Sequence, residues 1–375
     1  MLFHHSAADY NAAASAAAKS ARDKIQAMIA KGQANALQVV ERVMNEVPTD
    51  RIVKGEKVHF AARVVNEEKG EHVIDAVIED QPFRLHKHAM AQVRERLHIP
   101  AAYSDYLLGE KGWGAEKLAR DMEEIVAHEN ARYLTREVGG EVRGWLSDQF
   151  RRLDSRPLLE AFVDSASEAG LVPVEGYALD TKIAFKALLP IVFEPIPNEV
   201  MAFGLKWGNS DYGNGKHNVH AFIVRLWCTN YAIAEDVLSQ VHLGGRLPDN
   251  LIMSQQTYQL DTQTSVSAMR DVVAGLLSPA KVNETLEAIK ESHERDINPR
   301  NAFDVIAKRL QKKEVEAVKS VFEGQDTYNL PEGKTAWRLS NAVSWIANAT
   351  EDRERALDMM RLAGEIAKLP AGKAK

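Results

Sequence analysis

The segment from 204 to 230 holds the residues whose types and spacing could bind a nucleic acid. It reads GLKWGNSDYGNGKHNVHAFIVRLWCTN, in which two apolar strands flank a long polar turn that contains glycines. Long loops on rigid sheets often carry function. Strand alternation places Arg225 and Trp227 on one face of the second strand, whereas Phe222 and Val224 lie on the opposite face, which is expected to be the core face.

An arginine and an aromatic ring on a sheet face can neutralise phosphates and stack unpaired bases, and each stacked base contributes about 1–3 kcal/mol. If the turn folds back over this face, it brings lysine, histidine and amide side chains to the rim. The candidate nucleic-acid-binding residues of the segment are Lys206, Asn209, Ser210, Lys216, His217, Arg225, Trp227 and Asn230. In the alternative interpretation, Trp227 and Ile223 pack under the carboxy-terminal helices, while Arg225 pairs with a carboxylate.

A second basic group lies between 143 and 156. Its candidate phosphate-binding residues are Arg143, Arg151 and Arg152, with Trp145 and Phe150 interleaved among them. These cations could extend an electrostatic track for a single strand. The competing interpretation is that acidic residues close in the sequence neutralise them at a solvated surface. Those acidic residues are Glu141, Asp148 and Asp154.

Recognised motifs for catalysis or metal binding are absent from the sequence. There is no P-loop lysine, no GxSxG turn and no recognisable Cys–His pairing. The histidine pairs at 86/88 and 217/220 lack a third ligand at a recognised spacing. The sequence therefore predicts a protein that is not an enzyme and that uses no metal and no cofactor. A hydrolase acting through the 204–230 loop is a further alternative, because only coordinates can reveal a convergent acid/base pair.

The composition is that of a globular chain that can bury a sizeable core. The 375 residues are 45% hydrophobic, and 47 basic and 53 acidic residues give a net charge of −6. Affinity for nucleic acid must therefore come from a local basic surface. The single cysteine, Cys228, excludes an intramolecular disulfide and favours a reducing compartment. Because no basic leader and no apolar run of about 20 residues is present, we expect a cytoplasmic protein that does not enter a membrane.

The hydrophobic patterning predicts an α+β protein, with a central antiparallel sheet between N-terminal and C-terminal helical regions. Apolar residues recur at helical spacing through 6–47, and Pro48 ends this helical stretch. We expect domain boundaries that give an N-terminal helical segment at 1–48, an α+β core at 49–260 and a C-terminal helical region at 261–375. The Ala-rich first helix is a candidate subunit contact for a homo-oligomer.

Strand signals concentrate in the core region. The segments 58–65 and 72–79 are predicted to form a hairpin, and Gly139-Gly140 marks a second hairpin because both glycines can take positive φ. The stretch 172–230 has short Pro and Gly/Asn turns that favour an antiparallel sheet. Beyond Gln259 the pattern is helical. The helices expected there are 266–277, 282–294, 302–322, 335–349 and 353–368.

Four blocks of the sequence, in this order, resemble a known family. They are LHKHAMAQVRERLHIPAAYSDYLL at 85–108, VRGWLSDQFRRLD at 142–154, the 204–230 segment and TAWRLSNAVSWIAN at 335–348. Together they resemble the phage/plasmid-like protein family, a domain of unknown function found in phages, prophages and plasmids. The most specific matches are Asn209-Ser210, Gly213, Arg225, Cys228-Thr229-Asn230 and Asn341-Ala342, whereas Tyr231 departs from the family pattern.

The resemblance implies mobile-element biology in the host cytoplasm, in the context of replication and recombination genes, and it implies no established activity. Together with the 204–230 hypothesis, it leads us to expect a phage- or plasmid-type accessory protein that binds single-stranded DNA in annealing, recombination or replication. The alternative is a non-enzymatic structural or host-interaction protein that assembles through its helices and does not bind nucleic acid. The acidic net charge favours this alternative.

Overall fold

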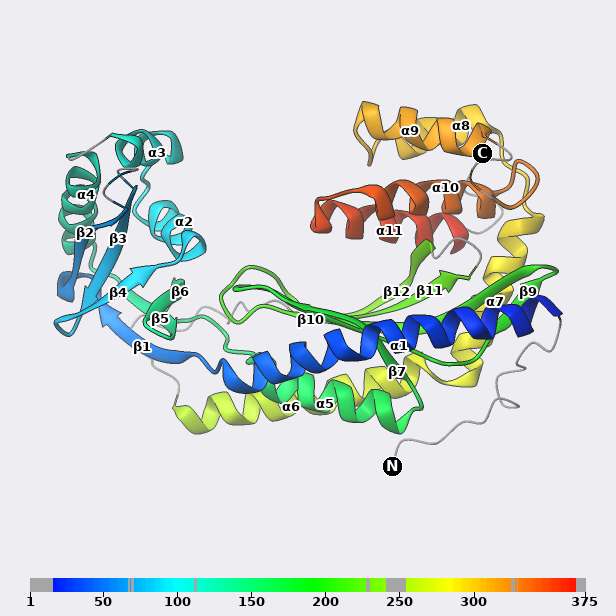
Figure 1. Ribbon diagram of the computed structural model, residues 1–375, viewed down its shortest axis with the longest axis horizontal. Helices are drawn as coiled ribbons and strands as arrows, with labels where there is room; N and C mark the ends of the chain where they lie inside the picture. Colours follow the sequence, from blue (N-terminus) through cyan, green and yellow to red (C-terminus); the bar gives the residue numbers. More distant parts are fainter. Residues whose placement is uncertain are drawn as a thin grey trace.

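The computed structural model describes most of the chain and confirms the α+β class. The described residues are 16–66, 68, 71–110, 113–226, 230–240, 254–324, 328 and 330–368. They form two six-stranded sheets and eleven α-helices, with helical regions at both ends (Figure 1). The expected central sheet is therefore divided into two sheets, because residues 49–147 build a sheet of their own.

The first sheet belongs to an N-terminal lobe. Its strand order is β1-β5-β6-β4-β3-β2, and β4 and β6 are its parallel pair. One face is covered by helices whose apolar side chains, such as Val93 and Met122, pack with Phe60 and Trp145 of the sheet. The elements are β1 (Thr49–Lys54), β2 (Val58–Asn66), β3 (Glu71–Ile78), β4 (Gln81–Leu85), α2 (Lys87–Arg96), α3 (Ala101–Gly109), α4 (Gly114–His128), β5 (Arg132–Val138) and β6 (Glu141–Ser147).

The predicted hairpins of this lobe are confirmed. The β2–β3 pair is antiparallel, as its alternating apolar residues indicate. Between β5 and β6, Gly139 and Gly140 have φ angles of +60° and +80°, which a residue with a Cβ rarely adopts. The two-residue turn is thus formed by the pair of residues that can form it without strain.

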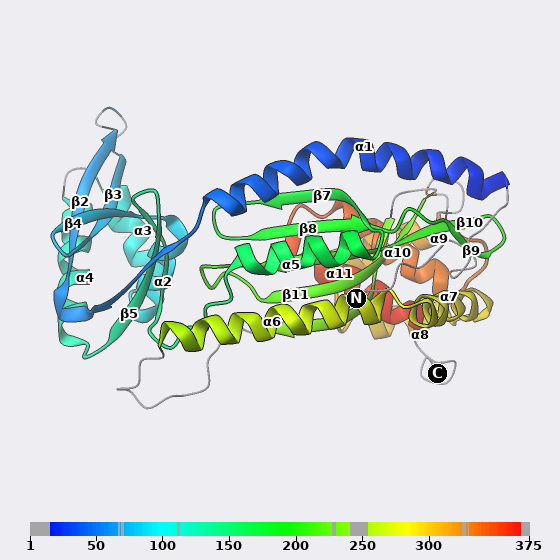
Figure 2. The same cartoon turned by 90° about the horizontal axis from the view of Figure 1, so that it is seen from below.

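The second sheet is the larger core of the molecule. Its order is β12-β11-β10-β8-β7, and β9 pairs with β10. Figure 2 shows α5 and α6 across one face of this sheet and α1 along its β7 edge. The elements are α1 (Ala16–Asn45), α5 (Ser155–Glu168), β7 (Val172–Ala178), β8 (Ile183–Leu188), β9 (Phe193–Ile196), β10 (Glu199–Asn209), β11 (His217–Arg225), β12 (Asn230–Gln240) and α6 (Gln255–Leu276).

Both faces of β10 and β11 are buried. On one face, Trp207 and Ile223 lie in a cluster with Phe162 of α5 and Val273 of α6. On the other face, Phe222 and Val224 pack with Ala18, Ala21, Ile25 and Ile29 of α1. The predicted alternation of β11 is therefore confirmed, but both of its faces are core faces. The apolar stripe of α1, which we considered for subunit contacts, packs against the sheet of its own chain.

The helices within residues 299–368 stack above the second sheet in Figure 1. The segment expected to be one helix at 302–322 is two helices, because Gln311 begins a new one with a capping box that includes Glu314. None of the described helices combines the length and the apolar composition that a bilayer span requires. The helices of the C-terminal region are α7 (Pro279–Glu294), α8 (Pro299–Ile306), α9 (Lys312–Glu323), α10 (Ala336–Ala349) and α11 (Arg353–Lys368).

Candidate functional site

The polar loop between β10 and β11 reaches into the N-terminal lobe. The backbone carbonyl of Tyr212 accepts hydrogen bonds from His88 Nε2 at 3.0 Å and from Gln92 Nε2 at 2.9 Å. At Gly213, where φ is +74°, an added Cβ would lie 2.7 Å from Leu146 Cδ2. The loop therefore joins the two lobes, and the glycine permits its close approach.

Asn209 and Ser210, two of the predicted binding residues, hold this loop in place. Asn209 Nδ2 donates to Leu153 O at 2.7 Å and to Ser155 Oγ at 2.9 Å. Ser210 Oγ accepts from Asn214 N at 2.9 Å. Both side chains belong to buried residues, so their polar atoms serve the internal packing of the loop.

Arg225 lies at the far end of the hairpin from this loop. Arg225 faces Met201 across the β10–β11 ladder, whereas the loop follows the pair Gly208 and Asn218. The Arg225 guanidinium is buried and forms two hydrogen bonds with the Glu199 carboxylate. The expected folding of the loop over Arg225 was therefore wrong, and the alternative in which Arg225 pairs with a carboxylate is confirmed.

The other predicted residues of the segment are distributed between core and surface. Lys206 and His217 are buried, and His217 Nε2 accepts a hydrogen bond from Trp207 Nε1 at 3.2 Å. Lys216 is exposed. Trp227 lies outside the described residues, and Asn230 is the first residue of β12. The structure therefore does not bring the segment's candidates together at one surface.

The second basic group has acidic partners from distant elements. Arg143 Nη1 lies 2.7 Å from Oε2 of Glu46, the residue that follows α1. Nε and Nη2 of Arg151 each lie 2.6 Å from the Asp261 carboxylate of α6. The expected neutralisation by neighbours in the sequence is confirmed for Glu141, which lies 3.6 Å from Arg143 Nε, whereas Glu46 and Asp261 are partners that the tertiary fold brings to the group.

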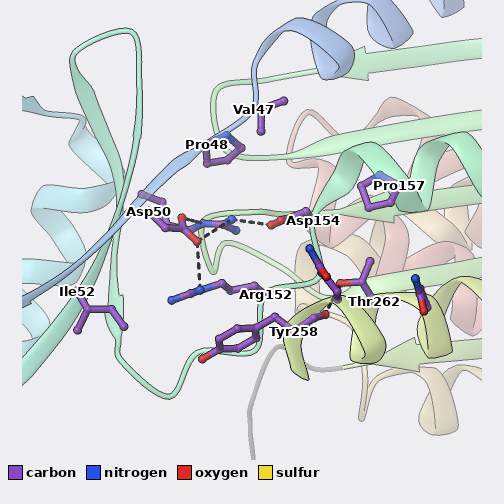
Figure 3. Close-up of a pocket in the computed structure, with 12 residues that line it drawn as sticks. Val47, Pro48, Asp50, Ile52, Arg152, Asp154, Pro157, Tyr258 and Thr262 are labelled. Carbon is purple, nitrogen blue, oxygen red and sulfur yellow. Dashed lines mark hydrogen bonds and ion pairs between the residues drawn. The ribbon is translucent and has the colours of Figure 1, made fainter. Parts of the chain in front are cut away.

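Arg152 is the predicted residue that lines a large pocket. This pocket lies between the lobes, at β1, the start of α5 and the first turns of α6, and has a volume of about 1000 Å³ (Figure 3). This volume is at the upper end of the range of about 300–1,000 Å³ that is typical of ligand sites. The lining residues are Val47, Pro48, Asp50, Ile52, Arg136, Arg152, Asp154, Pro157, Tyr258, Gln259, Thr262 and Gln263.

A buried arginine at the base of the pocket joins both lobes. The Arg136 side chain is 1% exposed, and its Nε lies 2.7 Å from Asp50 Oδ1 while its Nη2 lies 2.6 Å from Asp154 Oδ1. Its Nη1 donates to the backbone carbonyl of Asp211 at 2.8 Å. Burial alone would lower the pKa of Arg136, but the charges of these aspartates outweigh it and raise the pKa.

Asp211 connects the loop to α5. Its Oδ1 accepts hydrogen bonds from Ser155 N at 2.7 Å and from Ser155 Oγ at 2.8 Å. Burial of the carboxylate raises the pKa of Asp211 to about 6, and the negative charge of Asp154 acts in the same direction, whereas Arg136 opposes the shift. Protonation of Asp211 would therefore occur a little below neutral pH, at the junction of the lobes.

Arg152 and Tyr258 form an arginine–aromatic pair on the pocket wall. Arg152 Cζ lies 4.3 Å from the centroid of the Tyr258 ring, and Arg152 Nε lies 3.1 Å from Asp50 Oδ2. Within the described ranges, no hydrogen bond engages the terminal Nη atoms of Arg152. Gln259 and Gln263, one turn apart on α6, add amide groups to the same pocket.

The pocket residues Asp50, Arg136 and Tyr258 were not predicted from the sequence, and neither was Asp211, which contacts Arg136. One signal for Arg136 was present, because strand alternation in RYLTREV places it on the same face as Leu134. An arginine beside an apolar residue on one strand face indicates a buried and paired cation. Its partner Asp50 lies directly opposite on β1, and this pairing follows from strand order, which the sequence does not give.

The chain matches no protein-family model, and the searches of curated proteins and of solved structures gave no match. The resemblance to the phage/plasmid-like family therefore stays a prediction. In the described part of the chain, no group of three or more His, Cys, Asp or Glu side chains is arranged to hold a metal ion.

Proposed function

We propose that the protein binds single-stranded DNA and seats an unpaired nucleotide in the pocket between the lobes. The observation that carries this proposal is the Arg152–Tyr258 pair, a flat cation over an aromatic ring with open guanidinium nitrogens. Arginine and tyrosine are side chains on which unpaired bases stack, and the stacking tolerates any base because each base has a π-face.

Each part of a nucleotide has a partner of suitable chemistry in this pocket. The open Nη atoms of Arg152 can donate to a phosphate. The amides of Gln259 and Gln263 can donate to and accept from a base edge. Ile52 and Pro157 supply apolar wall, as ligand pockets commonly require.

The biological setting of the proposal comes from the family resemblance. Binding of single strands suits an accessory role in annealing, recombination or replication on a phage or plasmid, in the cytoplasm of the host. Proteins with such roles commonly assemble along the strand, since cooperativity is usual in single-strand binding. We include a homo-oligomer in the proposal for this reason.

A second candidate function is a structural or host-interaction protein that ignores nucleic acid. The buried Arg225–Glu199 pair favours it, because Arg225, a predicted nucleic-acid-binding residue, forms an internal ion pair. The two candidates differ in one property, which is affinity for an oligonucleotide.

Fluorescence anisotropy of a short labelled single strand tests the proposal. We expect wild type to bind and Tyr258→Ala to raise the Kd about tenfold, since stacking of one base contributes about 1–3 kcal/mol. Tyr106→Ala is the matched control, because Tyr106 is 57% exposed on α3, away from the pocket residues. Absence of binding at low salt would contradict the proposal and favour the structural candidate, whereas equal losses in both variants would contradict the pocket as the binding site.

A further inference from the structure

Asp154 occupies the N-cap position of α5 but does not cap its own helix. An aspartate at this position ordinarily accepts a hydrogen bond from a backbone N–H of the first turn. The Asp154 side chain makes no such bond, and Pro157, the third helical residue, has no N–H to donate to it. The Ser155 N–H, at the first helical position, is bound by Asp211 of the β10–β11 loop. The Asp154 carboxylate instead contacts Arg136 and lines the pocket.

One oxygen of Asp154 is held and the other is open. Oδ1 lies 2.6 Å from Arg136 Nη2, which fixes the carboxylate in place. The side chain is 42% exposed, and among the described residues no hydrogen bond engages Oδ2. In Figure 3, dashed lines link the Asp50 carboxylate to Arg152 and, through the guanidinium of Arg136, to Asp154. The pocket therefore offers an anchored acceptor at Asp154 and, beyond Asp50, the donors of Arg152.

We infer that Asp154 selects the base in the pocket, so that bases with an exocyclic amino group are preferred over uracil and thymine. This inference rests on the proposed binding of single strands. A carboxylate only accepts hydrogen bonds, and the amino group N4 of cytosine donates to Asp or Glu. Uracil and thymine present a carbonyl oxygen at the same position, which the carboxylate repels.

The same charges fix the direction in which the nucleotide enters. Asp154 repels a phosphate, whereas the Nη atoms of Arg152 attract one. The backbone is therefore held on the Arg152 side and the base edge on the Asp154 side. With the sugar-phosphate held there, the edge that carries position 4 of a pyrimidine is the part that reaches Asp154.

Oligo(dC) and oligo(dU) of equal length give the sharpest test. Their bases differ at position 4 and in the proton on N3, while backbone charge and ring size are the same. We expect wild type to bind oligo(dC) about tenfold more tightly than oligo(dU) in competition anisotropy. Equal affinity for the two strands would overturn the base selection and leave single-strand binding intact, whereas binding of neither would overturn both.

Asp154→Asn links the preference to this residue. The variant keeps an oxygen for Arg136 but adds an NH₂ donor, which suits the carbonyl of uracil. We expect the preference for oligo(dC) to disappear or to reverse, while Glu160→Gln, on an exposed pair of the same helix, leaves it unchanged. A preference that persists in folded Asp154→Asn would overturn the assignment. If this variant does not fold, the affinities of wild type for oligo(dC) and oligo(dU) still test the base preference.

Discussion

At the scale of single residues, Arg136 is the side chain on which the junction of the lobes depends. It contacts Asp50 of β1, Asp154 of α5 and the backbone of Asp211 in the β10–β11 loop. A buried ion pair contributes little compared with a well-packed apolar substitute, but removal of one partner leaves uncompensated buried charge. Because several aspartates surround Arg136, removal of its side chain should cost much more than its ion pairs contribute to the stability of the fold.

We predict that Arg136→Met lowers the free energy of unfolding by about 3–5 kcal/mol, because it leaves these carboxylates without their shared cation. Arg156→Met is the control, since its pair with Glu160 is exposed and such pairs contribute about 0.3–0.5 kcal/mol. Urea unfolding of both variants measures the difference. A loss below about 1 kcal/mol for Arg136→Met would contradict the central role of this residue.

Asp211 gives the junction a dependence on pH. Its pKa of about 6 lies above the ordinary value of 3.8, so the folded protein binds this proton more tightly than the unfolded chain. The free energy of unfolding therefore rises as the pH falls through 6, and this contribution is complete below the ordinary pKa.

We predict that Asp211→Asn removes this contribution. Relative to the variant, wild type should gain about 1 kcal/mol of unfolding free energy between pH 7 and pH 5. Comparison of the two proteins cancels the titration of other groups, and urea titrations at both pH values give the measurement. The same pH dependence in both proteins would show that Asp211 does not titrate in this range.

At the scale of elements, the patterns of the sequence predicted strands and helices well but not what covers them. Alternation in β11 separated Ile223 from Phe222 and Val224, and the structure confirms the two faces. Burial of the Ile223 face under carboxy-terminal helices was the alternative interpretation, and Val273 of α6 shares a core cluster with Ile223. The contribution of α5 was not predicted, because no local pattern shows which helix packs on which face. The role of the β10–β11 loop was missed for the same reason, since its partners His88 and Gln92 lie in another lobe.

The close approach of this loop makes a specific glycine necessary. We predict that Gly213→Ala destabilises the protein by about 1–3 kcal/mol, because its φ is positive and a Cβ would contact Leu146. Gly275→Ala is the matched control, since no atom lies within 4 Å of a Cβ at this helical position, and alanine favours a helix by up to about 1 kcal/mol. Thermal unfolding should shift in opposite directions, and equal shifts would contradict the docking of the loop.

At the scale of the whole molecule, most of the candidate arginines in the described part of the chain are paired with acidic side chains. The net charge is −6, and the candidates Arg143, Arg151 and Arg225 each have an acidic partner. The sequence predicted the acidic balance, but the pocket between the lobes follows from the tertiary arrangement of β1, α5 and α6. No local sequence pattern indicates such an arrangement, so Tyr258 was not predicted as a site residue.

This pairing predicts a weak dependence of DNA binding on salt. If Arg152 supplies the main phosphate contact, the slope of log K against log salt concentration should be about −0.7, the value for one phosphate on a single strand. Anisotropy titrations over a range of salt concentrations measure the slope. A value several times larger would indicate an extended basic track and would contradict the pocket as the main site.

Photochemical cross-linking tests the central claim, that an unpaired base lies against Tyr258, most directly. Oligo(dC) containing 5-bromodeoxycytidine would be irradiated with the protein, and the adduct would be located by digestion and mass spectrometry. We predict an adduct in the peptide that contains Tyr258, which is lost in Tyr258→Ala and kept in Tyr106→Ala. Adducts confined to other peptides, such as the one that holds Trp227, or no adduct, would contradict the account.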